Sequence, residues 1–219
     1  MSLTVFQVAV EGLDDNFSYV IANTETKETA IVDPTGKIER VETVLQEQGL
    51  QPTLVLITHT HLDHYDQLAA VTNRYQDLVV YVHELGEEKV SSSTPAPVRS
   101  FEEGSVITLG NSEISVLHTP GHLNDSVCFY IAAAHSADGT PLLIAGDTLF
   151  VHGCGRTTPG EVEDLYMSLQ RLKTLPSETI VFPGHDYGPA PTSTIGEELI
   201  HNKYFLAKDL EEFISLRLG

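Results

Sequence analysis

The side chains best suited to chemistry gather in residues 58–64, which read Thr-His-Thr-His-Leu-Asp-His. Residues 54–57 directly before them form an apolar run typical of a buried parallel strand. Imidazole and carboxylate groups bind zinc, iron or manganese, and the absence of cysteine argues against a closed structural zinc site. The pattern therefore predicts a reactive metal site at the carboxyl end of a buried strand. Its candidate ligands are His59, His61, Asp63 and His64.

Three further candidate ligands each follow an apolar run, and they are His122, Asp147 and His185. A glycine immediately precedes each of them, which permits a sharp turn and a close approach of the backbone. Strand ends can converge on one point when their loops turn inward. We therefore expect these three residues to meet the first cluster at a common edge.

The elements that must position these ligands follow from the hydrophobic periodicity. Strand, helix and strand across residues 29–57 predict a βαβ unit with its functional loop at the carboxyl end of the second strand. Residues 84–104 are polar and are expected to form a loop inside the domain. Two blocks of strands closed by helices predict two packed sheets flanked by helices. Strands are expected over residues 4–10, 17–22, 29–32, 54–57, 78–82, 106–109, 114–117, 127–131, 142–145 and 179–182, and helices over 38–45, 68–72, 162–173 and from 195 onward.

The composition limits the partners of this 219-residue chain. Its formal net charge is −19, from 31 acidic and 12 basic residues, which disfavours a nucleic-acid substrate. An anionic small substrate would need a local cation to hold it. Only Cys128 and Cys154 are present, so no disulfide framework is expected, and no segment approaches the about 20 apolar residues of a membrane span. The default expectation is a cytoplasmic protein without a membrane partner; the oligomeric state does not follow.

Four motifs together resemble the metallo-β-lactamase superfamily over nearly the whole chain. They are His-Thr-His-Leu-Asp-His at 59–64, Thr-Pro-Gly-His at 119–122, Gly-Asp-Thr-Leu-Phe at 146–150 and Pro-Gly-His at 183–185. The resemblance implies an α/β fold, the αββα four-layer sandwich, formed by a single domain over residues 1–219 with a short helical C-terminus. It also implies that His59, His61 and His122 hold one metal. Asp63, His64 and His185 would hold a second, with Asp147 bridging the two.

Such a ligand set suits a metal hydroxide better than a protein nucleophile. Two divalent cations about 3.5–4 Å apart can share a bridging hydroxide, generate it near neutral pH and polarise a carbonyl group. Zinc is the expected metal, with iron or manganese as alternatives. Asp63 is a candidate catalytic residue because, besides binding a metal, it could orient the hydroxide.

Within this superfamily the chain is most similar to glyoxalase II and its short relatives. The resemblance lies in Asp-Asn-Phe at 15–17, Gly-Cys-Gly-Arg at 153–156 and Gly-His-Asp-Tyr at 184–187. It implies a hydrolase acting on a thioester of the hydroxyacylglutathione type. By this resemblance, Arg156 pairs with a glutathione carboxylate and Tyr187 bonds to the glutathione peptide backbone. A guanidinium group can grip a carboxylate through two hydrogen bonds, which suits that role.

The alternatives come from other branches of the superfamily. Residues 187–198 resemble persulfide dioxygenases, which implies a single iron held by His59, His122 and Asp147. Thr158 stands where glyoxalase II has a tyrosine, and only 34 residues follow His185, so the helical extension that carries further glutathione contacts is missing or reduced. Lactonase and β-lactamase activities also stay open.

The remaining histidines have simpler interpretations. His83, His135 and His201 are expected at the surface. His118 lies in a predicted strand and is a candidate to support a ligand, and His152 adjoins the Gly153 loop, where it could touch substrate.

Overall fold

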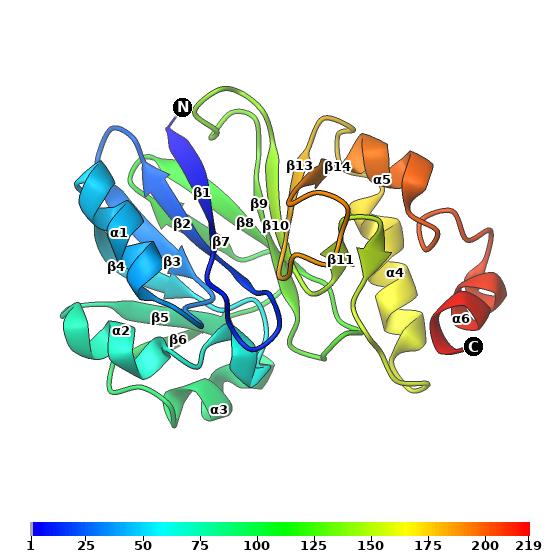
Figure 1. Ribbon diagram of the computed structural model, residues 1–219, viewed down its shortest axis with the longest axis horizontal. Coiled ribbons are helices and arrows are strands. Elements are labelled where there is room, and N and C mark those ends of the chain that lie inside the picture. The colour runs from blue at the N-terminus through cyan, green and yellow to red at the C-terminus, as the bar shows by residue number, and fades with distance from the viewer. Residues whose placement is uncertain (1) are drawn as a thin grey trace.

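The computed structural model describes residues 2–219 as two six-stranded sheets packed face to face, with helices on both outer faces (Figure 1). The first sheet has the order β1-β2-β3-β4-β5-β6 and the second the order β14-β13-β10-β9-β8-β7. The first contains β1 (Leu3–Ala9), β2 (Phe17–Asn23), β3 (Glu28–Val32), β4 (Gln51–Leu56), β5 (Val79–His83) and β6 (Val98–Phe101). The second contains β7 (Val106–Leu109), β8 (Ser112–His118), β9 (Val127–Ile131), β10 (Leu142–Gly146), β13 (Ile180–Pro183) and β14 (Ser193–Thr194), and β11 (Leu149–Phe150) pairs separately with β12 (Gly153–Cys154).

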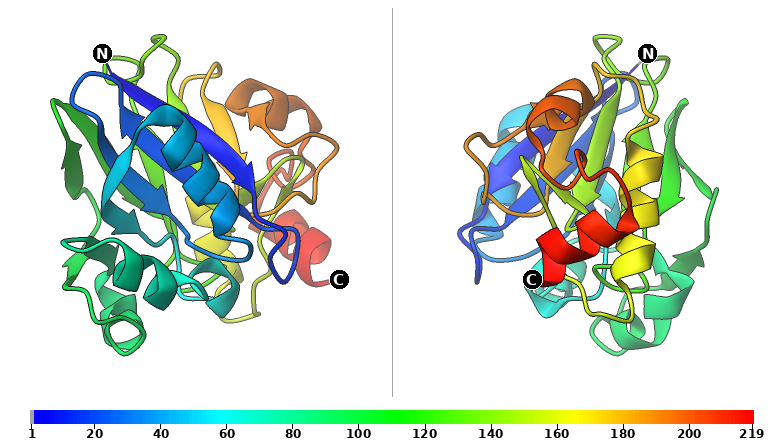
Figure 2. Two further views of the ribbon diagram at one scale, coloured as in Figure 1. Left: turned by 60° about the vertical axis from the view of Figure 1, so that its left-hand side comes forward. Right: turned by 90° about the vertical axis from the view of Figure 1, so that its right-hand side faces the viewer.

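The helices form the outer two layers. One set covers the first sheet: α1 (Glu39–Gln48), α2 (Leu68–Arg74) and α3 (Glu87–Ser91). The other set covers the second sheet, as the right-hand view of Figure 2 shows: α4 (Val162–Leu172), α5 (Ile195–His201) and α6 (Leu210–Leu218). Short 3-10 turns complete the list, η1 (Leu62–His64) and η2 (Glu84–Gly86). None of the helices within residues 2–219 has the length and apolar character that a membrane crossing needs.

Three buried apolar clusters correspond to the three junctions between these four layers. One lies between the first sheet and its helices and includes Val41 and Leu68, and a second lies between the sheets and includes Ile21 and Phe129. The third packs the second sheet against α4 and α6 and includes Leu165. The predicted αββα sandwich is therefore confirmed, because both sheets bury apolar side chains on both of their faces.

The edge that carries the functional loops is locked by backbone hydrogen bonds between the two sheets. The Val127 amide at the start of β9 donates to the Thr58 carbonyl after β4, over 2.9 Å. The Phe17 amide at the start of β2 donates to the Gly184 carbonyl after β13, also over 2.9 Å. Loops from both sheets are thus held against each other where the candidate ligands lie.

The prediction of a loop over residues 84–104 is wrong. This segment contains η2, α3 and the edge strand β6, which pairs in parallel with β5 from Val80–Val98 to His83–Phe101. Only Val98 and Phe101 of β6 are apolar, with Arg99 and Ser100 exposed between them. Pairing with β5 stabilises this strand, and the local sequence carries too weak an alternation to indicate it.

The C-terminal helix α6 buries one aromatic side chain in the fold, and its Arg217 donates a hydrogen bond from Nε to the Gly155 carbonyl over 2.8 Å. Phe213 is fully buried, and its ring centroid lies 5.4 Å from that of Tyr166 and 5.9 Å from that of Tyr204. We expect Phe213→Ala to lower the free energy of unfolding by about 3–5 kcal/mol, measured by urea denaturation. Ile214→Ala is the matched control, since Ile214 is 36% exposed, and its loss should be about 1 kcal/mol or less. Equal losses for the two variants would contradict this account of how α6 is held.

Candidate metal centre

All seven predicted ligands come together at the locked edge of the two sheets. His59 and His61 follow β4, and Asp63 and His64 belong to η1 directly after them. The other three each follow a strand of the second sheet: His122 after β8, Asp147 after β10 and His185 after β13. The ends of these strands therefore converge, as the sequence predicted.

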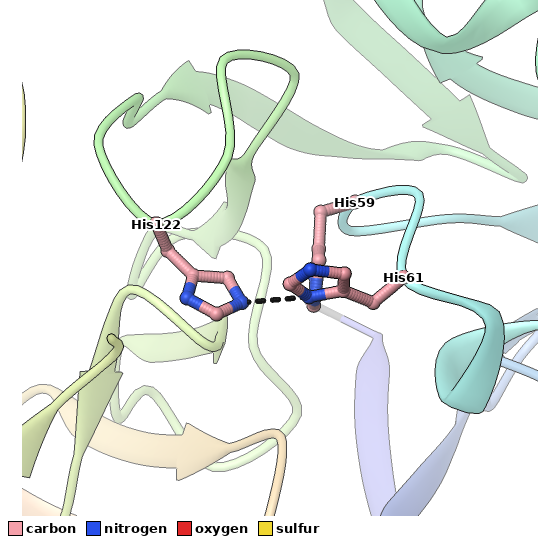
Figure 3. Close-up of side chains that lie close together, drawn as sticks. All are labelled: His59, His61 and His122. Atoms are coloured by element: carbon pink, nitrogen blue, oxygen red, sulfur yellow. Dashed lines mark hydrogen bonds between the residues drawn. The ribbon is translucent and has the colours of Figure 1, made fainter. Parts of the chain in front are cut away.

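Three imidazoles form one group, and Figure 3 shows their rings pointing toward one another from two separate loops. Nδ1 of His61 lies 3.1 Å from Nε2 of His59 and 2.9 Å from Nε2 of His122. Ligand nitrogens that each lie about 2.0–2.1 Å from one metal ion are separated by roughly 2.9–3.4 Å in octahedral or tetrahedral geometry. The spacing of this group is the spacing of three ligands around a single ion.

A second group lies beside the first. Nε2 of His64 and Nε2 of His185 are 3.2 Å apart, and Oδ2 of Asp63 lies 3.6 Å from Nε2 of His185 and 3.9 Å from Nε2 of His64. These three side chains also present one donor atom each to a common point. The larger spacing to Asp63 leaves its oxygen at the outer side of the group.

Asp147 connects the two groups. Its Oδ1 lies 3.3 Å from Nε2 of His64, and its Oδ2 lies 3.3 Å from Nε2 of His185 and 3.5 Å from Nε2 of His122. Oδ1 is buried and receives no hydrogen bond from any residue between 2 and 219. An ionised oxygen buried without a donor is costly unless a cation compensates it. The donor set and this unpartnered oxygen fit divalent metal ions.

Two of the glycines before the ligands are required by close packing. A side-chain carbon at Gly121, where φ is +124°, would lie 2.1 Å from the backbone nitrogen of Leu165. A side-chain carbon at Gly184 would lie 2.2 Å from Oδ1 of Asp147. Both approaches are shorter than any real contact of a Cβ atom, so only glycine lets these turns bring His122 and His185 to the centre.

In four of the five candidate ligand imidazoles, the nitrogen that faces away from the centre is held by a hydrogen-bond acceptor. These bonds fix the ring orientation and leave the opposite nitrogen free to bind a metal. Nδ1–H donates from His64 to Oδ2 of Asp33 (2.9 Å), from His122 to the Arg156 carbonyl (2.8 Å), from His185 to the Asp14 carbonyl (2.5 Å) and from His59 to Oγ1 of Thr58 (3.1 Å).

Asp33 is a supporting residue that the sequence analysis missed. Its buried carboxylate accepts hydrogen bonds from His64, from the Thr58 amide (2.8 Å) and from the Thr58 hydroxyl (2.6 Å). A signal was present, because Asp33 directly follows β3 just as the predicted ligands follow their own strands. Asn16 was also missed as a contact: its side-chain amide donates to Oδ2 and to the carbonyl oxygen of Asp63.

The electrostatics of the centre suit a cation. Burial lowers the pKa of His59 well below its usual value and lowers that of His122, so both rings are neutral ligands. Burial acts the same way on His64, but Asp147 and Asp33 outweigh it and raise the pKa of His64 well above its usual value. Burial alone would raise the pKa of Asp147, yet His64 holds it well below its usual range. The carboxylate is thus ionised and draws positive charge to the middle of the site.

A pocket of about 160 Å³ opens onto the centre. Tyr187 lies over it, with its ring stacked on His185 at 4.7 Å between centroids and its hydroxyl donating to Oδ2 of Asp14. The Arg156 side chain is exposed, and among residues 2–219 its guanidinium has no ion-pair partner. The pocket is lined by Asp14, His61, Asp63, His122, Asp147, Phe150, Arg156, His185 and Tyr187.

The other histidines lie outside this pocket. His83 is buried, so its predicted surface position is wrong. Its ring stacks on that of His118 with centroids 4.1 Å apart, and this contact helps to shield it from solvent. His118 bonds through Nε2 to the Asn124 carbonyl, two residues beyond His122, and therefore contacts a ligand loop. His152 does not line the pocket; its amide donates to the buried carboxylate of Glu198.

The comparisons with known proteins agree with this architecture. Residues 12–185 match the metallo-beta-lactamase superfamily, so the chain belongs to that superfamily. It is 33% identical over 180 residues to a hydroxyacylglutathione hydrolase of Pectobacterium atrosepticum, covering 82% of this chain and 65% of that protein. It is 32% identical to a hydroxyacylglutathione hydrolase of Haemophilus ducreyi, covering 95% of each. The expected glyoxalase II-like resemblance is therefore confirmed.

Solved structures add two further likenesses. The structure of ETHE1 from Myxococcus xanthus has a TM-score of 0.79 at 32% identity, covering 100% of this chain and 91% of that chain. The structure of TTHA1623 in a di-iron-bound form has a TM-score of 0.71 at 31% identity, covering 91% of this chain and 99% of that one.

The contacts of Asp33 yield a prediction about metal affinity. Asparagine offers one acceptor oxygen, so in Asp33→Asn either His64 or the Thr58 amide faces an amide NH2 group in place of an acceptor. We expect the affinity for zinc to fall about 10–100-fold, measured by competition with a chromophoric chelator. Asp66→Asn is the matched control, because the Asp66 carboxylate bonds to Thr35 and to the Gly36 amide, away from the ligands. Unchanged affinity in Asp33→Asn would contradict the supporting role.

Proposed function

We propose that this protein is a metal-dependent hydrolase that cleaves a thioester of the hydroxyacylglutathione type. The observation that carries the proposal is the position of Asp147 between two groups of three ligands: its Oδ2 lies 3.5 Å from Nε2 of His122 in the first group and 3.3 Å from Nε2 of His185 in the second. The similarity to hydroxyacylglutathione hydrolases supports the choice of a thioester as substrate.

His59, His61 and His122 would hold one ion, Asp63, His64 and His185 the second, and Asp147 both. We propose zinc for these positions, with iron or manganese as alternatives, because the donors are imidazole nitrogens and carboxylate oxygens. When bound, two such ions supply Lewis acidity and lower the pKa of water enough to provide hydroxide near neutral pH. The TTHA1623 structure in a di-iron-bound form supports occupancy of two positions in this fold.

Side chains of the pocket would bind and orient the substrate. Arg156 is the local cation that an anionic substrate needs in a chain of net charge −19, and its guanidinium binds a substrate carboxylate. The ring of Tyr187 forms one wall beside His185. Asp63 presents Oδ2 to the centre, and its orientation is held by the side-chain amide of Asn16 over 3.1 Å.

A persulfide dioxygenase with one iron is the second candidate. It would use His59, His122 and Asp147 as ligands, a subset of the same seven residues. The likeness to ETHE1 at 32% identity, over the whole of this chain, favours keeping this candidate. The two candidates differ in the number of metal ions that they need, which is one for the dioxygenase and two for the hydrolase.

One paired measurement tests the proposal. The protein is purified with its native metals, the metal content per chain is determined, and turnover is assayed with S-lactoylglutathione and with glutathione persulfide. We expect two metal ions per chain and release of glutathione from the thioester. One iron per chain with oxygen uptake on the persulfide, and no thioester turnover, would refute the hydrolase in favour of the dioxygenase.

Asp63→Asn tests whether Asp63 does more than bind a metal. Asparagine keeps a neutral oxygen donor but removes the negative charge that would orient a nucleophilic water. We expect kcat to fall by about 100-fold, the lower range for a general acid–base group, while metal content falls by less than half. Parallel losses of metal and activity would show a ligand role only, and Asp66→Asn again provides the control for a lost surface carboxylate.

A further inference from the structure

The walls of the pocket carry two charged side chains besides the candidate ligands, and they have opposite signs. Asp14 comes from the loop between β1 and β2, and Arg156 follows β12. Each is tied through its carbonyl oxygen to a different group of ligands: Asp14 to His185, and Arg156 to His122. The aspartate therefore lies beside the ligand group of His185, and the arginine lies beside the ligand group of His122.

The carboxylate of Asp14 is held in place before any substrate arrives. The Tyr187 hydroxyl donates to its Oδ2, and the Tyr187 ring is fixed by stacking on His185 and by an edge contact with Phe150 at 5.1 Å. Among residues 2–219, none donates a hydrogen bond to Oδ1 of Asp14. One carboxylate oxygen is thus oriented and left free, which lowers the entropic cost of binding a donor there.

We propose that Asp14 selects the thiol portion of the substrate by binding an ammonium group, across the pocket from the carboxylate contact already assigned to Arg156 under the proposed function. The substrate class is then the thioester of a zwitterionic thiol, and this inference rests on the proposed thioester hydrolase. Charge-assisted hydrogen bonds at both ends would fix the thioester across the centre. A neutral thiol would leave Asp14 without its partner, and a thiol carrying only negative charge would also place like charge against the Asp14 carboxylate.

The general acidity of the protein gives a competing explanation for any preference for cations. With a net charge of −19, the whole surface attracts positive groups. Asp15 separates the two explanations, because it is the next residue, is also an exposed aspartate, and lies outside the pocket lining. A local contact depends on Asp14 alone, and a long-range field changes equally with either residue.

The test compares three substrates that share one acyl group. They are S-lactoylglutathione, the same compound acetylated on its γ-glutamyl amine, and the same compound with its glycine carboxylate converted to an amide. For the unmodified enzyme we expect kcat/KM to fall about tenfold on acetylation and about tenfold on amidation, the effect of about 1.4 kcal/mol for one charge-assisted contact.

Single substitutions then assign each preference to one residue. Asp14→Asn keeps the backbone carbonyl that holds His185, and it should remove the penalty for acetylation while keeping the penalty for amidation. Arg156→Gln should do the reverse. Asp15→Asn should keep both penalties. Tyr187→Phe frees the Asp14 carboxylate to move, and the acetylation penalty should shrink without disappearing.

The outcomes distinguish this inference from the proposed function. If the protein hydrolyses S-lactoylglutathione but Asp14→Asn keeps the full acetylation penalty, the role of Asp14 is refuted and the hydrolase stands. If Asp14→Asn and Asp15→Asn reduce the penalty equally, the preference comes from the general field and the inference is again refuted. If no thioester in the set is cleaved by the metal-loaded protein, the proposed function itself fails.

Discussion

The arrangement of this protein depends on one buried carboxylate, Asp147, which lies between two groups of imidazoles. Its Oδ1 has no hydrogen-bond donor among residues 2–219, and its pKa is held low by His64 although burial opposes this. A negative charge in such a position is tolerated only where positive charge is close. The centre therefore needs cations, and the neutral rings of His59 and His122 are suited to bind them.

The two sheets keep that charge arrangement rigid. Backbone hydrogen bonds from Val127 to Thr58 and from Phe17 to Gly184 tie loops of one sheet to strands of the other at the site. Asp33 then links the two ends of the ligand segment 58–64, because its carboxylate accepts hydrogen bonds from both Thr58 and His64. Each contact removes freedom from a ligand before a metal binds, and pre-organised ligands bind a metal more tightly than flexible ones.

Under the proposed function, metal binding and substrate selection use different parts of the same two residues, Asp14 and Arg156. The backbone carbonyls of Asp14 and Arg156 orient His185 and His122, whereas their side chains face the pocket. Because the carbonyl is present in every residue type, the side chains at these two positions can change without loss of the hydrogen bonds to the ligands. This separation would let the substrate contacts vary while the candidate metal centre stays the same.

The sequence by itself determined the seven candidate ligands, the strands before them and the four-layer architecture, because each depends on a local pattern: an apolar run, a glycine turn and a polar side chain. Only the tertiary structure decided which residues distant in the sequence contact one another around the candidate ligands. Asp33, the Asp14–Tyr187 pair and the buried stack of His83 on His118 join residues far apart in the chain. The strand β6 likewise forms by pairing with β5, with little signal of its own. Local periodicity reports which face of an element is buried, whereas contacts between elements exist only once the sheets have packed.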